Sequence, residues 1–304
     1  MKNILVIGGT GFLGTAVVRE LARRTASADF CFTLPTRRRD RAKHLLVLPT
    51  ARVVDADVHD QATLARLMTG QDAVISLVGV LKGGEGEPYG KGFARAHVEL
   101  PRKIAAAAKA AGVRRLLHVS ALKAAGDAPS GYLRSKAAGE AMLLDAGLDL
   151  TLFRPSVIFG PGDAFLTLFA RMAKIAPFFP LAGADARFQP VWVEDVVATV
   201  ADSLLRSESI GAAYELCGPK QYSLRQLVSY AATVSGHPRA VIGLPHAIAW
   251  LQAWAMEFIP NGPMTRDNIR SMRVASVCDT GCTLPFGRVA TALEIVAPTY
   301  LRNG

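Results

Sequence analysis

Cysteine is scarce in this sequence, and the spacing of the cysteines argues against a structural metal site. Only Cys31, Cys217, Cys278 and Cys282 occur among the 304 residues. A structural zinc site usually needs four ligands in two close pairs, and the segment CDTGC has neither a second pair nor a histidine nearby. We therefore expect free thiols, no bound metal and a reducing compartment.

Segments of strongly biased composition are also missing. Hydrophobic residues make up 50% of the chain and charged residues 20%, with 27 Gly and 17 Pro, and we find no repeat. This composition argues against extensive disorder. Residues 3–7 run directly into a glycine-rich turn without the pattern of a signal peptide. We therefore expect a folded, cytoplasmic protein.

Acidic residues are fewer than basic ones. The 25 Asp and Glu stand against 35 Lys and Arg, which gives a formal net charge of +10 and a pI near 9.7. Such a balance favours an anionic partner: a phosphorylated cofactor, an acidic membrane surface or nucleic acid. The basic residues are scattered apart from Arg37–Lys43, and no nucleic-acid-binding motif accompanies them, so we expect no nucleic-acid partner.

Short apolar runs alternate with segments of helical period over the first half of the chain. KNILVIGGTGFLG reads as a strand followed by a glycine loop, and similar runs end with a sixth strand at Pro155. This alternation predicts a Rossmann-like α/β fold, a doubly wound parallel sheet with helices on both faces. We assign residues 1–155 to a dinucleotide-binding domain. Residues 156–304 would form a smaller, irregular C-terminal cap, interleaved with it.

One late segment, Leu244–Pro260, contains two of the three tryptophans and a single formal charge, Glu257. A membrane-spanning helix needs about 20 apolar residues, so this run is too short to cross a bilayer. Three interpretations remain open. The run could be a core helix, a partner-docking surface, or an interfacial helix with Trp250 and Trp254 at the level of the lipid headgroups.

The segment GGTGFLG predicts a dinucleotide site. Its early glycines permit a tight turn and close approach to a pyrophosphate, Gly14 permits close helix packing, and the following helix directs free N–H groups at the anion. The end of the third strand would border the adenine, and the end of the fourth would lie beneath the pyrophosphate and ribose. These positions are Gly8, Thr10, Gly11, Phe12, Leu13, Gly14, Asp57, Val58, Leu77, Val78 and Gly79.

The end of the second strand bears on the choice of cofactor. An NAD-selective site usually carries Asp or Glu there, and this chain has Thr36, Arg37 and Arg38. A guanidinium would attract a 2′-phosphate, so we predict a preference for NADP(H). Asp40 is near enough in sequence to keep NAD(H) open, and a solvated basic loop without a ligand is the alternative.

In the segment YLRSK, Tyr132 and Lys136 are four residues apart, so both would lie on one helical face. Together with GGTGFLG, HVSAL and RPSVIFGPGD, this segment resembles the short-chain dehydrogenase/reductase superfamily in its extended or atypical branch. The late segments FQPVWVEDVV, PMTRDNIRSM and ALEIVAPTYL are similar to the subgroup of the NADPH-binding accessory subunit of respiratory complex I, the alpha-subcomplex subunit 9 type, and its bacterial relatives.

The resemblance implies roles for several residues. Tyr132 would act as general acid or base, and Lys136 would lower its pKa from about 10 and bind the nicotinamide ribose. Ser120 would be the catalytic hydroxyl at the end of the fifth strand. Pro155 and Ser156 would contact the nicotinamide.

Two positions depart from the superfamily pattern. HVSAL offers only Ser120 as a hydroxyl, with Ala121 and Leu122 where other members keep hydroxyl residues, so Ser120 could instead be structural. His97 stands where many members have Asn, and it could relay protons through water or simply hold the structure together.

Two functions therefore stay open. The first is an NADP(H)-dependent oxidoreductase or epimerase acting on an unknown carbonyl or hydroxyl substrate, with Tyr132 as the proton-transfer group. The second is a non-catalytic NADPH-binding protein with a structural, assembly or redox-sensing role at a respiratory complex. The second would place the protein at the periphery of the inner membrane.

Overall fold

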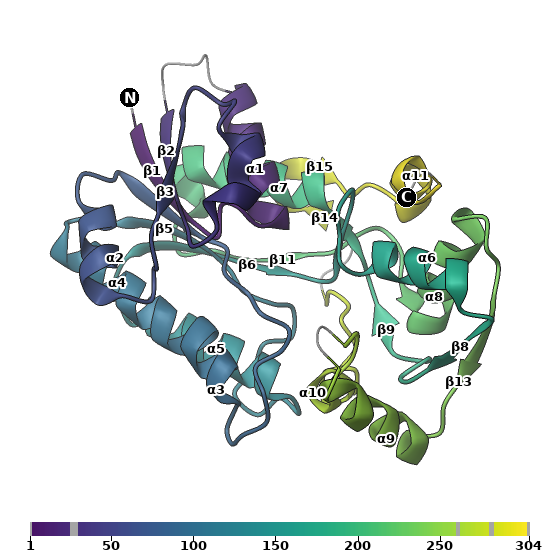
Figure 1. Cartoon of the computed structure of the whole chain (residues 1–304). Coiled ribbons are helices and arrows are strands. Elements are labelled where there is room, and N and C mark those ends of the chain that lie inside the picture. The colour runs from purple at the N-terminus through teal and green to yellow at the C-terminus, as the bar shows by residue number, and fades with distance from the viewer. Residues whose placement is uncertain (1, 25–29, 260–261, 280–282, 303–304) are drawn as a thin grey trace.

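A parallel sheet of seven strands forms the centre of the protein (Figure 1). The structure, a computed structural model, describes residues 2–24, 30–259, 262–279 and 283–302. The strand order is β11-β6-β5-β4-β1-β2-β3, and every pair in it is parallel. The expected Rossmann-like α/β fold is thereby confirmed. The strands are β1 (Lys2–Ile7), β2 (Phe30–Thr36), β3 (Ala51–Asp55), β4 (Ala73–Ser76), β5 (Arg115–Val119), β6 (Asp149–Pro155) and β11 (Ala213–Leu216).

Helices cover both faces of this sheet, as the alternating pattern predicts (Figure 1). One face packs against α1 (Phe12–Arg24) and α7 (Val193–Leu205), with a buried core of β-branched and aromatic side chains between them. The other face packs against α2 (Gln61–Met68), α4 (Leu100–Ala110) and α5 (Gly131–Leu144). Both cores consist of buried apolar side chains, and their close packing holds the strand ends that carry the candidate site.

Side-chain caps set the start of the helices that approach the site. The Asp60 carboxylate accepts the N–H of Thr63 at the start of α2, and the Ser130 hydroxyl accepts the N–H of Leu133 at the start of α5. These are the residue types that satisfy free N–H groups at helix starts. The Ser130 cap therefore fixes where the helix that carries Tyr132 and Lys136 begins.

The seventh strand, β11, comes from the C-terminal half and pairs with β6. No clear sequence pattern predicts this strand, because AYEL is four residues long and only Leu216 of the four is buried. The sheet of the nucleotide-binding half is therefore completed by a segment from beyond residue 155.

The remaining C-terminal residues build a smaller lobe beside the carboxyl ends of the strands (Figure 1). Its main core lies between α6, α8 and α11, and a second small core joins α9 to α10. Among the described residues no helix is both long and apolar enough to cross a membrane. The lobe contains α6 (Leu166–Ile175), α8 (Leu224–Val234), α9 (His246–Glu257), α10 (Arg266–Ser271), α11 (Leu293–Leu301), and the strand pairs β7 (Ile158–Phe159) with β10 (Val191–Trp192), β8 (Phe178–Leu181) with β13 (Ala240–Gly243), and β9 (Arg187–Phe188) with β12 (Tyr222–Ser223). The pair β14 (Thr283–Leu284) with β15 (Arg288–Val289) instead packs beside α7 on the nucleotide-binding half, where Leu284 joins the buried core and Arg288 pairs with Asp202 (Figure 1).

The expectation of free thiols throughout is wrong. Cys217, at the end of β11, forms a disulfide with Cys278. The two are 61 residues apart in sequence, and they meet because the Cys278 N–H donates to Gln189 Oε1 and the preceding chain pairs beside β9. Cys31 is a free, half-buried thiol, and Cys282 lies outside the described residues, as does Pro260 at the end of the tryptophan-bearing run.

Candidate functional site

The loop between β1 and α1 has the backbone shape that a bound pyrophosphate needs. Gly8 has a φ of 87°, a left-handed conformation that favours glycine. A Cβ at Gly14 would collide with the Gly8 carbonyl oxygen, so the helix can pack against the turn only because Gly14 has no side chain. The first turn of α1, with Phe12 and Leu13 half-buried, follows directly. Its free N–H groups provide the anion site typical of such a turn.

The basic residues at the end of β2 lie beside this loop. Thr36 is the last residue of β2, and Arg37 and Arg38 follow it with exposed side chains. The Thr36 hydroxyl accepts the N–H of Arg38 at 3.2 Å and lies 3.5 Å from the Thr10 hydroxyl. Asp40 belongs to the following 3-10 helix, Arg39–Leu45, beyond the strand end. The strand end itself therefore carries a hydroxyl and two guanidinium groups.

Asp57 and Val58 come directly after β3, at the same edge of the sheet. Asp57 Oδ1 accepts the N–H of His59, which closes the turn, and Val58 is partly buried against the core of that face. Arg95 forms a loose ion pair with Asp57, with 3.7 Å between the nitrogen and the oxygen. The edge where the adenine would rest is therefore apolar on one side and charged on the other.

Lys136 lies buried between the ends of two neighbouring strands. Its ammonium donates to the carbonyl oxygen of Val119, at the end of β5, at 3.2 Å and to that of Val78, after β4, at 3.4 Å. Leu77 and Gly79 belong to the same strand end, and the Lys136 ammonium faces the space that a Cβ on Gly79 would use. Burial lowers the pKa of Lys136 to about 8, although Glu140 acts in the opposite direction.

Tyr132 lies half-buried at the start of α5. Its ring meets those of Phe93 and His97 edge-on, with ring centroids 6.0 and 5.6 Å apart. Among the described residues its hydroxyl has no hydrogen-bond partner. Burial raises the pKa of Tyr132 to about 12, in the opposite direction to the lowering that the family resemblance implies. In this structure the phenol is therefore protonated at neutral pH.

Ser120 has a buried hydroxyl that no described residue satisfies. It lies directly after β5 and is 4% exposed, and its hydroxyl oxygen finds no hydrogen-bond partner. An unpaired buried hydroxyl costs free energy unless a ligand or water completes it. Ser156, one residue past β6 and Pro155, differs, because its hydroxyl donates to the carbonyl oxygen of Ser276 at 2.8 Å. Only Ser120 of the two thus keeps a free hydrogen-bonding capacity.

His97 serves as a structural link, the second of the two roles left open by the sequence. Its Nε2 accepts the N–H of Val80 at 3.0 Å, and its Nδ1 lies 2.9 Å from the Ser135 hydroxyl. That hydroxyl donates in turn to the carbonyl oxygen of Tyr132. Both ring nitrogens are therefore occupied, and burial lowers the pKa of His97 to about 2. The neutral ring holds α5 against the end of β4.

Two further residues near Lys136 and Tyr132 escaped the sequence reasoning. His118 is buried on β5, and burial, aided by the charge of Lys136, lowers its pKa to about 3. Asp267 is buried on α10 and accepts the backbone N–H groups of Gly131 at 2.7 Å and Tyr132 at 3.1 Å. The segment PMTRDNIRSM contains Asp267 but offers no local signal for a contact 135 residues away.

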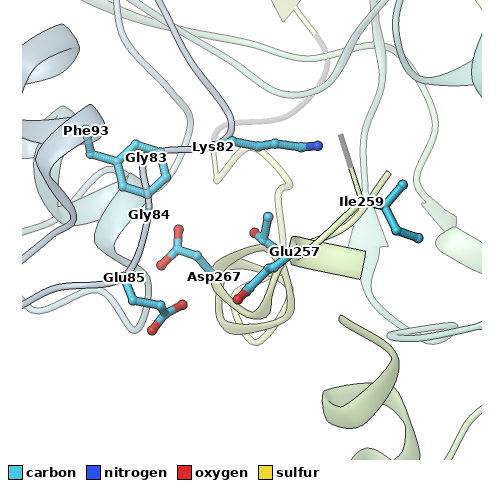
Figure 2. A pocket seen from close by; sticks show the side chains of 9 residues that line it. Lys82, Gly83, Gly84, Glu85, Phe93, Glu257, Ile259 and Asp267 are labelled. Carbon is cyan, nitrogen blue, oxygen red and sulfur yellow. The ribbon is translucent and has the colours of Figure 1, made fainter. Parts of the chain in front are cut away.

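A cavity of about 330 Å³ adjoins the Tyr132 helix (Figure 2). Phe93 lies between it and Tyr132, and the Asp267 carboxylate points into it. Two ion pairs close its outer side: Arg266 with Glu257, and Arg270 with Glu85, each at 2.8 Å. The residues that line it are Lys82, Gly83, Gly84, Glu85, Phe93, Glu257, Ile259, Thr265 and Asp267.

Several known proteins are similar to this chain. A protein family described as NAD(P)H-binding matches residues 8–162. The mitochondrial NADH dehydrogenase [ubiquinone] 1 alpha subcomplex subunit 9 of Rattus norvegicus is 30% identical over 98% of this chain and 79% of its own length. A ceramide reductase of Caulobacter vibrioides is 31% identical over 83% of this chain and 78% of its own length. The NADPH complex of an NADPH-dependent quinone oxidoreductase from Escherichia coli superposes on this chain with a TM-score of 0.77. The two sequences are 23% identical, and the match covers 99% of this chain and all of the other. This similarity shows the fold alone.

Proposed function

Because this chain belongs to the extended short-chain dehydrogenase/reductase-like family of NAD(P)H-binding proteins, we propose that it is an NADP(H)-dependent reductase of a carbonyl group. The observation that carries the proposal is two hydroxyls without a partner in the part of the chain that the structure describes, that of Ser120 after β5 and that of Tyr132 at the start of α5. Ser120 is buried without a partner, and the Tyr132 hydroxyl has none among the described residues. Both hydroxyls would donate a hydrogen bond to the oxygen of a substrate carbonyl.

The residues present fit the dinucleotide. Gly8 and Gly14 leave room that side chains would fill, the first turn of α1 offers N–H groups, and Lys136 lies where the ribose would rest. The preference for the phosphorylated form rests on Arg37 and Arg38, which can pair with a 2′-phosphate. Thr36, in place of an acidic residue, would leave the bare ribose hydroxyls of NAD(H) without their usual partner.

Tyr132 is suited to proton donation in a reduction. Burial raises the pKa of its phenol to about 12, so it holds its proton at neutral pH and could donate that proton to a carbonyl oxygen. NADPH, when bound, would supply the hydride for the carbonyl carbon, and the product would be an alcohol. Ser120 would hold the carbonyl oxygen, and the Lys136 ammonium would stabilise the phenolate that remains.

The cavity beside Tyr132 indicates the kind of substrate. Phe93 and Ile259 give it apolar surface, and Glu85, Glu257 and Asp267 bring three carboxylates, of which those of Glu85 and Glu257 are paired with arginines. An uncharged carbonyl compound suits this lining better than a phosphorylated sugar, whose phosphate would meet the carboxylates. The ceramide reductase of Caulobacter vibrioides is a relative whose name describes action on a lipid.

A second function is favoured by one specific observation. The similarity to subunit 9 of the rat NADH dehydrogenase extends over 98% of this chain. Such a relative supports a protein that holds NADPH as a fixed ligand at a respiratory complex, on the periphery of the membrane. In that case the free Tyr132 hydroxyl would meet no substrate.

The experiment that separates the two functions measures binding and turnover on the same sample. NADPH binding is followed by fluorescence, and NADPH oxidation is followed with a panel of apolar ketones, including 3-keto lipids. We expect turnover that falls by roughly 10²- to 10⁴-fold in Tyr132→Phe while NADPH binding persists. Tyr230→Phe, on α8 in the C-terminal lobe, is the matched control and should keep its activity. Tight NADPH binding without oxidation of any ketone would overturn the reductase and leave the second function.

A further inference from the structure

Helix α9 turns its large apolar side chains away from the protein. Its buried residues are Ala249 and Ala253, which pack against Ala182 and Ile269. Its exposed face carries Ile248, Leu251 and Trp254, followed by Phe258, with Leu251 60% and Phe258 72% exposed. All twelve residues of α9 are described, and the stripe 248, 251, 254 and 258 contains no polar side chain. An ordinary surface helix has the opposite arrangement.

Two strands in contact with α9 also expose apolar side chains. The Gln252 side chain of α9 donates to the Pro180 carbonyl oxygen on β8 at 3.0 Å, and the Leu244 N–H donates to that of Leu181. Phe178 on β8 and Ile242 on its partner β13 are both exposed. We call the group of exposed side chains Phe178, Ile242, Ile248, Leu251, Trp254 and Phe258 the α9 surface. Exposed apolar side chains that gather on neighbouring elements are typical of an interaction site.

Positive charge accompanies the α9 surface. Residues 237–259 and 262–273, which contain β13, α9 and α10, carry four Lys and Arg against two Asp and Glu, a net charge of +2. Arg266 and Arg270 of α10 lie over the Trp250 ring, at 5.9 and 5.1 Å from its centroid, and the exposed Arg273 contacts His246 at the start of α9. Arg266 and Arg270 also pair with Glu257 and Glu85, so Arg273 is the arginine of these three that an external anion could reach.

We infer that the α9 surface docks on the surface of an anionic lipid bilayer. A helix with apolar and aromatic residues on one side, next to basic residues on a neighbouring helix, has the arrangement of a helix lying in the membrane interface. Trp254 is a residue type found at headgroup level, and Leu251 and Phe258 are types that enter the apolar boundary below it. The formal net charge of +10 on the chain favours an anionic bilayer over a neutral one.

Docking in this orientation would bring the cavity to the lipid. Glu257 ends α9 and Ile259 follows it, and both line the cavity beside Tyr132 (Figure 2). The bilayer would therefore lie next to the wall through which an apolar substrate could enter. This last step rests on the proposed reductase function, whereas the docking itself does not.

The test is flotation of the full chain with vesicles. Neutral phosphatidylcholine vesicles are compared with vesicles that also contain phosphatidylglycerol, at low and high salt. We expect binding to the anionic vesicles that weakens with salt, and a fall in bound fraction of at least about tenfold in the double variant Leu251→Ser, Trp254→Ser. The matched control is Val289→Ser, Ile295→Ser, which removes two side chains exposed by 87% and 69% outside the α9 surface and should bind like the unmodified protein.

Three results would overturn the inference. The first is that the unmodified chain does not bind vesicles, and the second is that the two double variants bind vesicles equally. The third is that the α9 variant loses self-association while its vesicle binding is unchanged, which would identify a second copy of the chain as the occupant. NADPH binding, measured on every variant, shows that each one is folded. A variant that keeps NADPH binding and ketone reduction in detergent but loses flotation would separate docking from the reductase function.

Discussion

Helices α4 and α9 are nearly equal in length, and they place their apolar residues in opposite ways. α4, in the nucleotide-binding half, buries Leu100 and Ile104 against the sheet. α9, in the C-terminal lobe, buries two alanines and exposes Leu251 and Trp254. The apolar residues of α4 are covered by the sheet. Those of α9 stay exposed on the surface, where the proposed membrane docking would cover them.

The two regions also differ in how their chemistry is fixed. Around Lys136 the ends of β4 and β5 lie between two apolar cores, so packed strands hold the candidate site groups in place. The cavity wall beside the lobe depends on ion pairs between Arg270 and Glu85 and between Arg266 and Glu257. Partly exposed pairs of this kind stabilise weakly, so that wall is easier to rearrange.

Replacing one glycine in each region should show the contrast most strongly. In Gly14→Ala the new methyl group would collide with backbone atoms of Gly8 and Gly9, which cannot move without opening the turn. We expect the free energy of unfolding to fall by at least about 3 kcal/mol, with loss of NADPH binding. Gly243→Ala, on β13, meets the end of the flexible Arg225 side chain and should cost less than about 1 kcal/mol. Urea denaturation gives both values, and equal costs would contradict the comparison.

Acid should destabilise the nucleotide-binding half through two neutral histidines. His97 and His118 have pKa values lowered to about 2 and 3, whereas an unfolded histidine has a pKa near 6.5. The unfolded chain therefore binds more protons below pH 6.5, and stability falls as the pH drops from there toward 3. At pH 5 the loss should be on the order of 4 kcal/mol for the pair.

The measurement is urea denaturation at pH 7 and pH 5. The double variant His97→Gln, His118→Gln should lose most of the pH dependence, even if it is less stable at pH 7. His246→Gln, which removes an exposed imidazole from α9 in the lobe, should keep it. An unchanged pH dependence in the double variant would show that other groups cause the acid sensitivity.

Short sequence patterns predict those parts of the candidate site that consist of consecutive residues. The glycine turn, the end of β2 and the helix with Tyr132 and Lys136 are each contained in a few consecutive residues, so their spacing was informative. The order of strands and helices followed from alternating hydrophobic periods, except for β11. That strand is too short and too exposed to be distinguished from a loop.

Contacts between distant segments could not be predicted in this way. Asp267 reaches the start of α5 from 135 residues away, and Cys278 reaches Cys217 from 61. The Leu244–Pro260 run was equally compatible with a core helix and a surface, because composition does not state which side a helix buries. Packing around Ala249 and Ala253 determines that side. Burial likewise decided the direction of the Tyr132 pKa, which spacing to Lys136 did not reveal.

The smallest expected effect concerns Arg37 and Arg38 at the end of β2. It tests whether these two arginines bind the 2′-phosphate of NADPH or only add to the positive charge of the surface. Arg37→Glu with Arg38→Glu should weaken NADPH binding by roughly tenfold to a hundredfold, since a charge-assisted hydrogen bond contributes about 1.5–3 kcal/mol. NADH binding should change much less, because it lacks the 2′-phosphate. Arg171→Glu with Arg187→Glu makes the same change of net charge on exposed positions of the C-terminal lobe and should leave both affinities unaltered. Fluorescence titration of all three proteins with both cofactors decides the matter. If the two double variants weakened NADPH equally, overall charge would govern binding, and the end of β2 would lose its assigned role in the choice of cofactor.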